Sequence, residues 1–191
     1  MFALTKLELR RLLDAVDIAT PFGRRDYLLI RFLSQTALRV GECAGLLTCL
    51  VADNGTPRHY LHLPAAICKG SRGRVVPLNA VARACIAKQL AFNSERGFST
   101  APASPLFQNR CHGPLSVRSI QSLVAYYRRR AGLDVRATPH TFRHSAASQM
   151  IASGVPTVHV QRILGHRKLS STQVYLHPHQ SELLESSRVL E

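Results

Sequence analysis

The sequence predicts an α+β protein that is mainly helical and contains one small antiparallel β-sheet of three strands. Apolar residues recur with helical periodicity along most of the 191 residues. The β-favouring runs, by contrast, are confined to residues 57–78, where a Gly-Ser-Arg-Gly turn separates two of them. The length corresponds to one sizeable domain, and 46% of the residues are hydrophobic, which is enough to bury a core.

The first two helices are predicted from a cap and from an apolar pattern. Thr5 can cap a helix that starts in LTKLELRRLLDAV, and Glu8 three residues later completes a capping box. Residues 24–36 predict a second helix with apolar positions on nearly all sides, so we expect it deep in the core. The apolar stripe of the first helix consists of Leu9, Leu12, Leu13 and Val16.

The pattern then changes in the middle of the chain. ALRVGECAGLL predicts a short helical piece, and the runs HYLHL, AAICK and RVVPL predict the three strands. Lys69 falls at a strand end, beside the turn. Helical periodicity resumes over residues 79–93 and is followed by a loop rich in Ser, Pro and Gly. The remaining helices are predicted over residues 116–132, 138–153, 156–164, 170–177 and 180–190.

The charge balance is the strongest global signal. The chain has 25 Lys and Arg against 11 Asp and Glu, which gives a net charge of +14 at pH 7. A positive field of this size favours a polyanionic partner, with nucleic acid as the first candidate. A ribosome-like or simply basic protein remains the alternative.

The cysteines and the apolar runs indicate a cytoplasmic protein. The number of cysteines is 5, which is odd, and none lie in a Cys-x-x-Cys pair. A disulfide framework or a cysteine zinc site is therefore not expected, and a reducing compartment fits. No apolar run is long enough to span a membrane, and charges interrupt the amino terminus too early for a signal peptide.

The segment TPHTFRHSAAS, residues 138–148, places His140, Arg143 and His144 at one helix start. Its Thr-Pro pair suits an N-cap and the first helical position. His140 and Arg143 then share a face, where free N–H groups favour an anion. A solvated basic face is the alternative. A metal site on His140 and His144 lacks the Glu of H-E-x-x-H and a third ligand.

Other basic residues have a structural and a functional interpretation each. Arg39 lies in an apolar context and can pair with Glu42, either as a structural ion pair or so that its planar group faces a phosphate. Lys69 can be an ordinary hairpin lysine or a mobile cation of a site. Arg72 and Arg74 suit contacts to backbone phosphates of DNA, or solvated charge.

The segment ILGHRKLSSTQVYLH carries the last two candidates. Gly165 ends a helix, His166 sits on the turn, and Tyr175 follows nine residues later. Taken alone, a structural histidine and a packing tyrosine would explain both.

Taken together, these segments resemble the tyrosine recombinase, or phage integrase, family, in particular its Xer-like and fimbrial-invertase-like members. TALRVGECAGL is similar to the first arginine box, with Glu42 as the supporting acid, and CKGSRGRVVPL to the catalytic β-hairpin. TPHTFRHSAAS and LGHRKLSSTQVYLH match the two later boxes, and the resemblance covers almost the whole chain. The matching catalytic positions are Arg39, Lys69, His140, Arg143, His166 and Tyr175.

The resemblance implies a transesterification at a DNA phosphodiester. Tyr175 would attack the phosphorus to form a 3′-phosphotyrosine and release a 5′-hydroxyl. Arg39 and Arg143 would clamp the non-bridging oxygens, supported by His166.

It also implies the proton transfers. His140 would accept the tyrosine proton, and Lys69 would protonate the departing 5′-oxygen. This chemistry needs no metal and no cofactor, which leaves His144 as a supporting or packing residue.

For organisation, the resemblance makes residues 1–191 a catalytic domain and leaves the family's N-terminal core-binding domain absent. The implied partner is double-stranded DNA, with a homo-tetramer on two sites or a monomer without DNA. The tail, residues 177–191, would pack on a neighbouring subunit or on its own domain. The alternatives are a non-catalytic DNA-binding remnant or regulator and a type IB topoisomerase.

Overall fold

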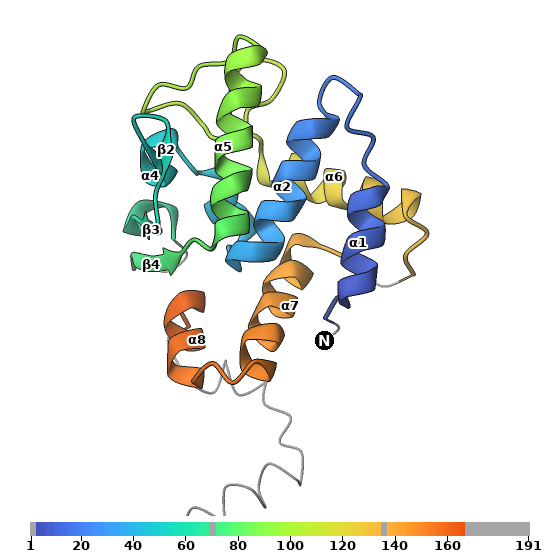
Figure 1. Ribbon diagram of the computed structural model, residues 1–191, viewed down its shortest axis with the longest axis vertical. Coiled ribbons are helices and arrows are strands. Elements are labelled where there is room, and N and C mark those ends of the chain that lie inside the picture. The colour runs from blue at the N-terminus through green and yellow to red at the C-terminus, as the bar shows by residue number, and fades with distance from the viewer. Residues whose placement is uncertain (1–2, 69–71, 135–136, 167–191) are drawn as a thin grey trace, which may run out of the picture.

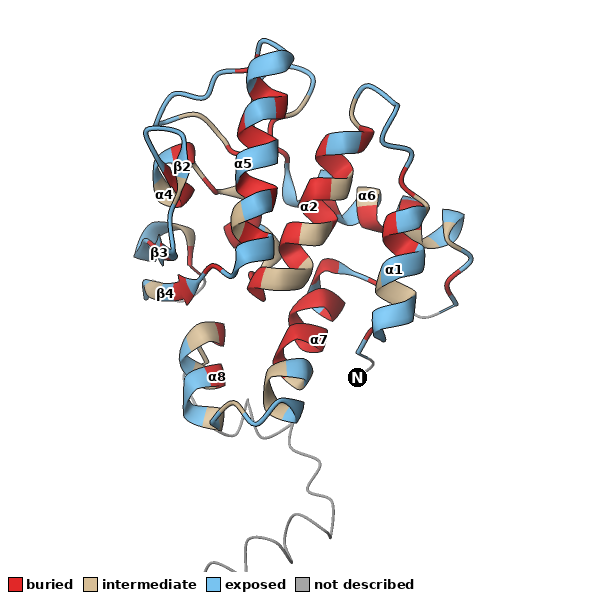
Figure 2. Ribbon diagram, in the orientation of Figure 1, coloured by how far each residue is buried: buried red, intermediate tan, exposed pale blue. Residues whose placement is uncertain are grey.

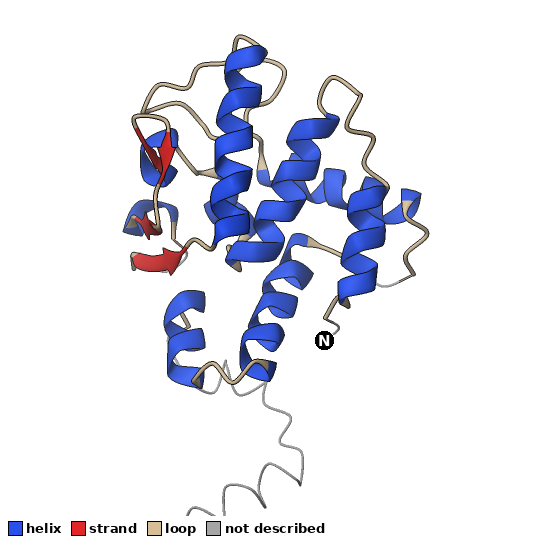
Figure 3. Ribbon diagram, viewed as in Figure 1, coloured by secondary structure: helices blue, strands red, loops and turns tan. Residues whose placement is uncertain are grey.

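A computed structural model describes residues 3–68, 72–134 and 137–166 (Figure 1). Helices dominate these ranges, and the short strands lie between α4 and α5 (Figure 3). The predicted mainly helical α+β class is therefore confirmed. The helices are α1 (Lys6–Asp14), α2 (Gly23–Thr36), α3 (Val40–Ala44), α4 (Thr48–Val51), α5 (Ala80–Glu95), α6 (Val117–Arg130), α7 (Pro139–Ala152) and α8 (Thr157–Leu164).

Helix α2 is the central element of the core, as its sequence predicts. It packs against α1, α5 and α7, and Figure 2 shows that most of its surface is buried. Leu29, Ile30 and Phe32 have no exposed surface at all. The helix ends at Ala37, whose φ of 52° turns the chain left-handed just before Arg39. Arg39, the first predicted active-site residue, thus follows closely after the core helix.

Local capping signals define the other helix starts. The Thr5 and Glu8 side chains and backbones form the predicted capping box of α1. The Ser116 side chain accepts a hydrogen bond from Ser119 N at the start of α6. Thr138 caps α7, which begins with Pro139 at its first position. Each cap satisfies backbone N–H groups that the first helical turn leaves without a partner.

The β structure differs from the predicted three-stranded sheet. Two separate two-stranded antiparallel sheets form, β1 (Ala52–Asp53) with β2 (Thr56–Pro57) and β3 (Tyr60–Leu63) with β4 (Arg74–Pro77). Residues 65–67, the first part of the run AAICK, form a short 3-10 helix, η1 (Ala65–Ile67), in place of a strand. Alanine has little preference for strands, and η1 satisfies its backbone locally through Ile67 N to Pro64 O and Cys68 N to Ala65 O.

Helices α7 and α8 lie side by side, and α8 also contacts β4 (Figure 1). They share a small second cluster of apolar residues with the end of α2. Helix α8 ends at Gly165, whose φ of 65° again requires a left-handed backbone. The cluster consists of Ala37, Ala146, Ala147, Val160 and Leu164.

Two predicted helices, over residues 170–177 and 180–190, lie outside the described residues. Within the described ranges, no helix is long and apolar enough to cross a membrane.

Candidate active site

Four basic residues from distant parts of the sequence meet beside the carboxyl end of α2. Arg39 directly precedes α3, and Arg74 is the first residue of β4. Arg143 lies in α7, and His166 follows the end of α8. The hydrogen bonds and electrostatic interactions of these side chains join the four segments.

Arg39 is held by Glu42 in the pair that the sequence predicts. Glu42 Oε2 accepts a hydrogen bond from Arg39 N at 2.7 Å, and Glu42 Oε1 accepts one from Arg39 Nη1 at 3.1 Å. The Glu42 side chain is 1% exposed, whereas that of Arg39 is 29% exposed. The carboxylate therefore anchors the arginine from inside and leaves part of it accessible.

Arg74 was expected to contact DNA phosphates, a role that stays a prediction, and the structure places its side chain against Glu42. Its side chain is only 8% exposed, and its two terminal nitrogens bind the Glu42 carboxylate at 2.5 and 2.7 Å. Its Nε donates to the carbonyl of Ile163 at 2.7 Å. The guanidinium thus lies inside the site as the second partner of Glu42.

These contacts set the charge of Glu42. Burial works to raise the pKa of its carboxyl group, but the hydrogen bonds from Arg74 and Arg39 and the charge of Arg74 outweigh burial and lower the pKa. Glu42 is therefore ionised at neutral pH. Three guanidinium groups, those of Arg39, Arg74 and Arg143, accompany this one carboxylate, so the site carries excess positive charge.

Arg143 is held by backbone carbonyls at the ends of two helices. Its Nη1 donates to Ala37 O, just beyond α2, at 2.7 Å, and its Nη2 donates to Leu164 O at the end of α8. The residue is 3% exposed. Helix carboxyl ends carry partial negative charge, which stabilises a cation there. The same contacts fix the orientation of Arg143 relative to Arg39.

The two histidines of the site favour their neutral forms. Partial burial, then the charge of Arg143 and of neighbouring basic groups, lowers the pKa of His140. Burial and the same arginine lower the pKa of His166 more strongly, to about 4. Both rings can therefore accept a hydrogen bond at neutral pH. The cations that act on His166 are Arg143, Arg39, Arg74 and His140.

Other predicted residues have different positions. His144 is buried, which agrees with a supporting or packing role. Arg72 is exposed, and its contact with DNA stays a prediction. Lys69 and Tyr175 lie outside the described residues, so their roles also stay predictions. Among residues 3–68, 72–134 and 137–166, no group of three or more His, Cys, Asp or Glu is placed to hold a metal ion.

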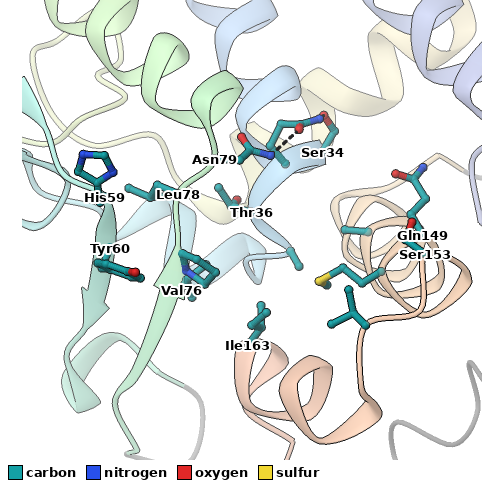
Figure 4. Close-up of a pocket in the computed structure, with 16 residues that line it drawn as sticks. Ser34, Thr36, His59, Tyr60, Val76, Leu78, Asn79, Gln149, Ser153 and Ile163 are labelled. Carbon is teal, nitrogen blue, oxygen red and sulfur yellow. Dashed lines mark hydrogen bonds between the residues drawn. The ribbon is translucent and has the colours of Figure 1, made fainter.

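A groove of about 460 Å³ lies next to the site, between the end of α2, strands β3 and β4, and helices α7 and α8 (Figure 4). Its walls include Thr36, Tyr60, Val76 and Ile163, and none of the four catalytic candidates that the structure describes lines it. The groove and the cluster of arginines are therefore separate features of this face.

Sequence reasoning missed the place of Arg74 in the site, although a signal was available. Side chains alternate between the two faces of a strand, so Arg74 must share a face with Val76. Val76 is 1% exposed in β4. The buried side of the hairpin thus included an arginine, and a buried arginine requires an acidic partner.

Comparison with known proteins identifies the family. The sequence pattern of the phage integrase family matches residues 3–182. The fold and the arginine-rich site therefore define a member of this family, and the chain belongs to it.

Individual relatives agree with this assignment. The chain is 35% identical over 173 residues to the tyrosine recombinase XerD of Corynebacterium glutamicum (strain ATCC 13032), which covers 89% of this chain and 55% of the relative. It is 32% identical over 174 residues to the tyrosine recombinase XerC of Bacillus subtilis (strain 168), with the same coverage of 89% and 55%. The chain thus spans about half the length of the curated relatives that it matches.

Solved structures share the fold. The integrase of the Tn1549 transposon, in complex with circular intermediate DNA, gives a TM-score of 0.82 at 17% identity over 100% of this chain and 67% of that one. The XerH site-specific recombinase, bound to difH substrate in a pre-cleavage complex, gives 0.77 at 23% identity over 99% of this chain and 54% of that one.

Proposed function

We propose that the chain catalyses DNA strand cleavage and rejoining in site-specific recombination, through a 3′-phosphotyrosine intermediate. The observation that carries this proposal is the convergence of Arg39, Arg143, His140 and His166, because the charges of the two arginines act on both histidines. Excess positive charge in a partly buried site favours a phosphodiester, and favours its more negative transition state still more.

In the proposed cleavage step, the Tyr175 oxygen attacks the phosphorus and forms a new P–O bond. The bond from phosphorus to the 5′-oxygen breaks, and its electron pair leaves with that oxygen. His140 takes the tyrosine proton, and Lys69 gives a proton to the 5′-oxygen. Rejoining is the reverse sequence, with a 5′-hydroxyl as the nucleophile, so the bond energy is conserved.

The protonation states of the two histidines suit this chemistry. A tyrosine has an ordinary pKa of about 10, so it needs a base at neutral pH. His140 has a lowered pKa and is available as a neutral acceptor. His166, with a pKa near 4, is a neutral hydrogen-bonding group beside the phosphate oxygens that Arg39 and Arg143 would bind.

The names of the relatives support the activity and the partner. The curated matches are tyrosine recombinases, and the similar solved structures include recombinases in complex with DNA. We propose double-stranded DNA as the substrate and assembly as a homo-tetramer on two sites. Exposed Arg72 is a candidate contact to the DNA backbone.

The test uses a library of duplexes with a randomised centre and a nick, incubated with the full chain. The nick lets the short strand diffuse away after cleavage, so a covalent protein–DNA adduct accumulates and survives denaturant. Tyr175→Phe should abolish the adduct. Tyr126→Phe is the matched control, because Tyr126 is an exposed residue of α6, and it should leave the adduct intact.

Two results would contradict the proposal. An adduct that persists in Tyr175→Phe would remove Tyr175 as the nucleophile. Sequence-specific binding without any adduct would instead support a non-catalytic DNA-binding protein.

A further inference from the structure

We propose that Arg74 is a positioning residue of the cleavage site. Through Glu42 and the Ile163 carbonyl, it fixes Arg39 and the turn that carries His166 relative to each other. The inference rests on the proposed cleavage function and assigns Arg74 a role in orienting the phosphate clamp.

The carboxylate of Glu42 is saturated with hydrogen bonds from Arg39 and Arg74. Its two oxygens accept hydrogen bonds from Arg39 N at 2.7 Å, Arg39 Nη1 at 3.1 Å, Arg74 Nη1 at 2.5 Å and Arg74 Nη2 at 2.7 Å. A carboxylate offers about four acceptor positions, so both arginines together determine its orientation. A change at Arg74 is therefore transmitted to Arg39 by the group that they share.

Arg74 also contacts the end of α8. Its Nε donates to Ile163 O at 2.7 Å, in the last turn of that helix. A Cβ atom at Gly165 would lie 2.8 Å from Arg74 Cδ and 3.3 Å from Nε, so only a glycine allows this close packing. His166 follows directly, which places its turn against the Arg74 side chain.

Arg74 also affects the net charge of the site. A buried carboxylate that paired with Arg39 alone would offset much of the positive charge that a phosphate needs. Arg74 supplies a second buried cation, with 8% exposure against 1% for Glu42. Glu42 can therefore orient Arg39 while the site as a whole remains positive.

The geometry requires arginine and not merely a positive charge. Arg74 binds the two oxygens of Glu42 with two nitrogens and the Ile163 carbonyl with a third. The single ammonium of lysine cannot span these positions at the same time. Arg74→Lys thus keeps the charge and removes the geometry.

The experiment compares Arg74→Lys with the matched control Arg24→Lys. Arg24 also forms an ion pair, with Glu95 at 2.7 Å, but the pair is exposed at the opposite end of α2. The probe is the nicked duplex recovered from the randomised library, cleaved in a single turnover at saturating protein. We expect Arg74→Lys to cleave about 10- to 100-fold more slowly with unchanged DNA affinity, because small misplacements of catalytic groups cost this much. Arg24→Lys should match the wild type.

A second substrate separates positioning from general damage. In a methylphosphonate duplex, a methyl group replaces one non-bridging oxygen of the scissile phosphate and removes its negative charge. The clamp then has less charge to stabilise, so the wild-type to Arg74→Lys rate ratio should shrink toward one. An equal ratio on both substrates, or a loss of affinity in place of rate, would overturn the proposal.

A second variant keeps the test valid if Arg74→Lys folds poorly in a thermal melt. Glu42→Gln removes the carboxylate charge and should show the same substrate dependence. In the double variant Arg74→Lys/Glu42→Gln, the fold-reduction in cleavage rate should be smaller than the product of the two single fold-reductions. Both changes disturb the same unit, in which Arg74 and Glu42 are in contact. Independent, multiplicative effects would contradict a shared role.

A readout without activity distinguishes this inference from the proposed function. The NMR signal of the His166 ring, assigned with His166→Gln, should shift in Arg74→Lys and stay unchanged in Arg24→Lys. A signal that does not move in Arg74→Lys overturns the positioning role. A wild type that forms no adduct refutes the proposed function, whereas the ring signal still reports whether Arg74 holds this turn.

Discussion

Gly165→Ala and Gly154→Ala form a matched pair that separates backbone strain from a steric clash with a residue of the site. Both glycines lie just beyond helices and have positive φ angles, +65° for Gly165 and +77° for Gly154. A side chain in the left-handed region costs roughly 1–2 kcal/mol, so both variants should lose a similar free energy of unfolding from backbone strain. In Gly154→Ala, the new Cβ would meet no heavy atom of the described residues within 4 Å.

Only Gly165→Ala introduces a steric clash with a residue of the site, Arg74. Its Cβ would lie 2.8 Å from Arg74 Cδ, which real Cβ contacts do not show, so the arginine side chain must shift. The contacts of Arg74 with Glu42 and the Ile163 carbonyl oppose this shift, so Gly165→Ala carries this cost in addition to the backbone strain that both variants share. The shift nevertheless displaces a guanidinium that orients Glu42 and Arg39. We expect cleavage to slow about tenfold beyond any effect of Gly154→Ala.

Thermal unfolding and single-turnover cleavage measure the two effects. Both variants should lower Tm by about 2–4 °C for each kcal/mol lost, as expected for a domain of this size. The cleavage rate should fall in Gly165→Ala only. Equal rates for the two variants would refute the link from Gly165 through Arg74 to the clamp.

Three further predictions follow from local features. The His166 ring has a folded-state pKa near 4, below its ordinary value, so the free energy of unfolding should decrease as pH falls from about 6.5 to 4. His166→Gln should weaken this pH dependence. The partial exposure of the ring keeps the effect below that of a fully buried histidine. Thr5→Ala removes the cap of α1 and should cost about 1 kcal/mol in denaturant unfolding, whereas an equal stability would show that the cap contributes nothing. Phe32→Ala removes a ring with no exposed surface and should cost roughly 3–5 kcal/mol in the same assay, and a cost below that range would mean that the core collapses around the cavity.

The features that sequence predicted well depend on neighbouring residues. The capping box at Thr5 and the N-cap at Thr138 involve groups three residues apart, so a short segment contains the whole signal. The burial of α2 follows from apolar residues on all its sides. The pair of Arg39 and Glu42 also spans three positions, and the structure confirms it.

The features that sequence missed depend on partners far along the chain. Glu42 is 32 positions from Arg74, and Arg74 is 89 positions from Ile163, so no local pattern indicates these contacts. The missing third strand has a similar origin. Its residues would have needed a strand partner across the sheet, whereas Cys68 and Ile67 satisfy their N–H groups within η1.

The two arginines proposed as the phosphate clamp are held in different ways, and the difference has a physical logic. Arg39 is oriented by a carboxylate, which would offset its charge if Arg74 did not share that carboxylate. Arg143 is oriented by the carbonyls of Ala37 and Leu164, which carry only partial charges and leave the guanidinium charge largely intact. Both arrangements fix the donors before a phosphate arrives, so little reorganisation is needed when charge develops in the transition state. Helix ends therefore hold Arg143 rigidly, whereas Arg39 is held by a buried ion pair with Glu42, whose charge Arg74 compensates.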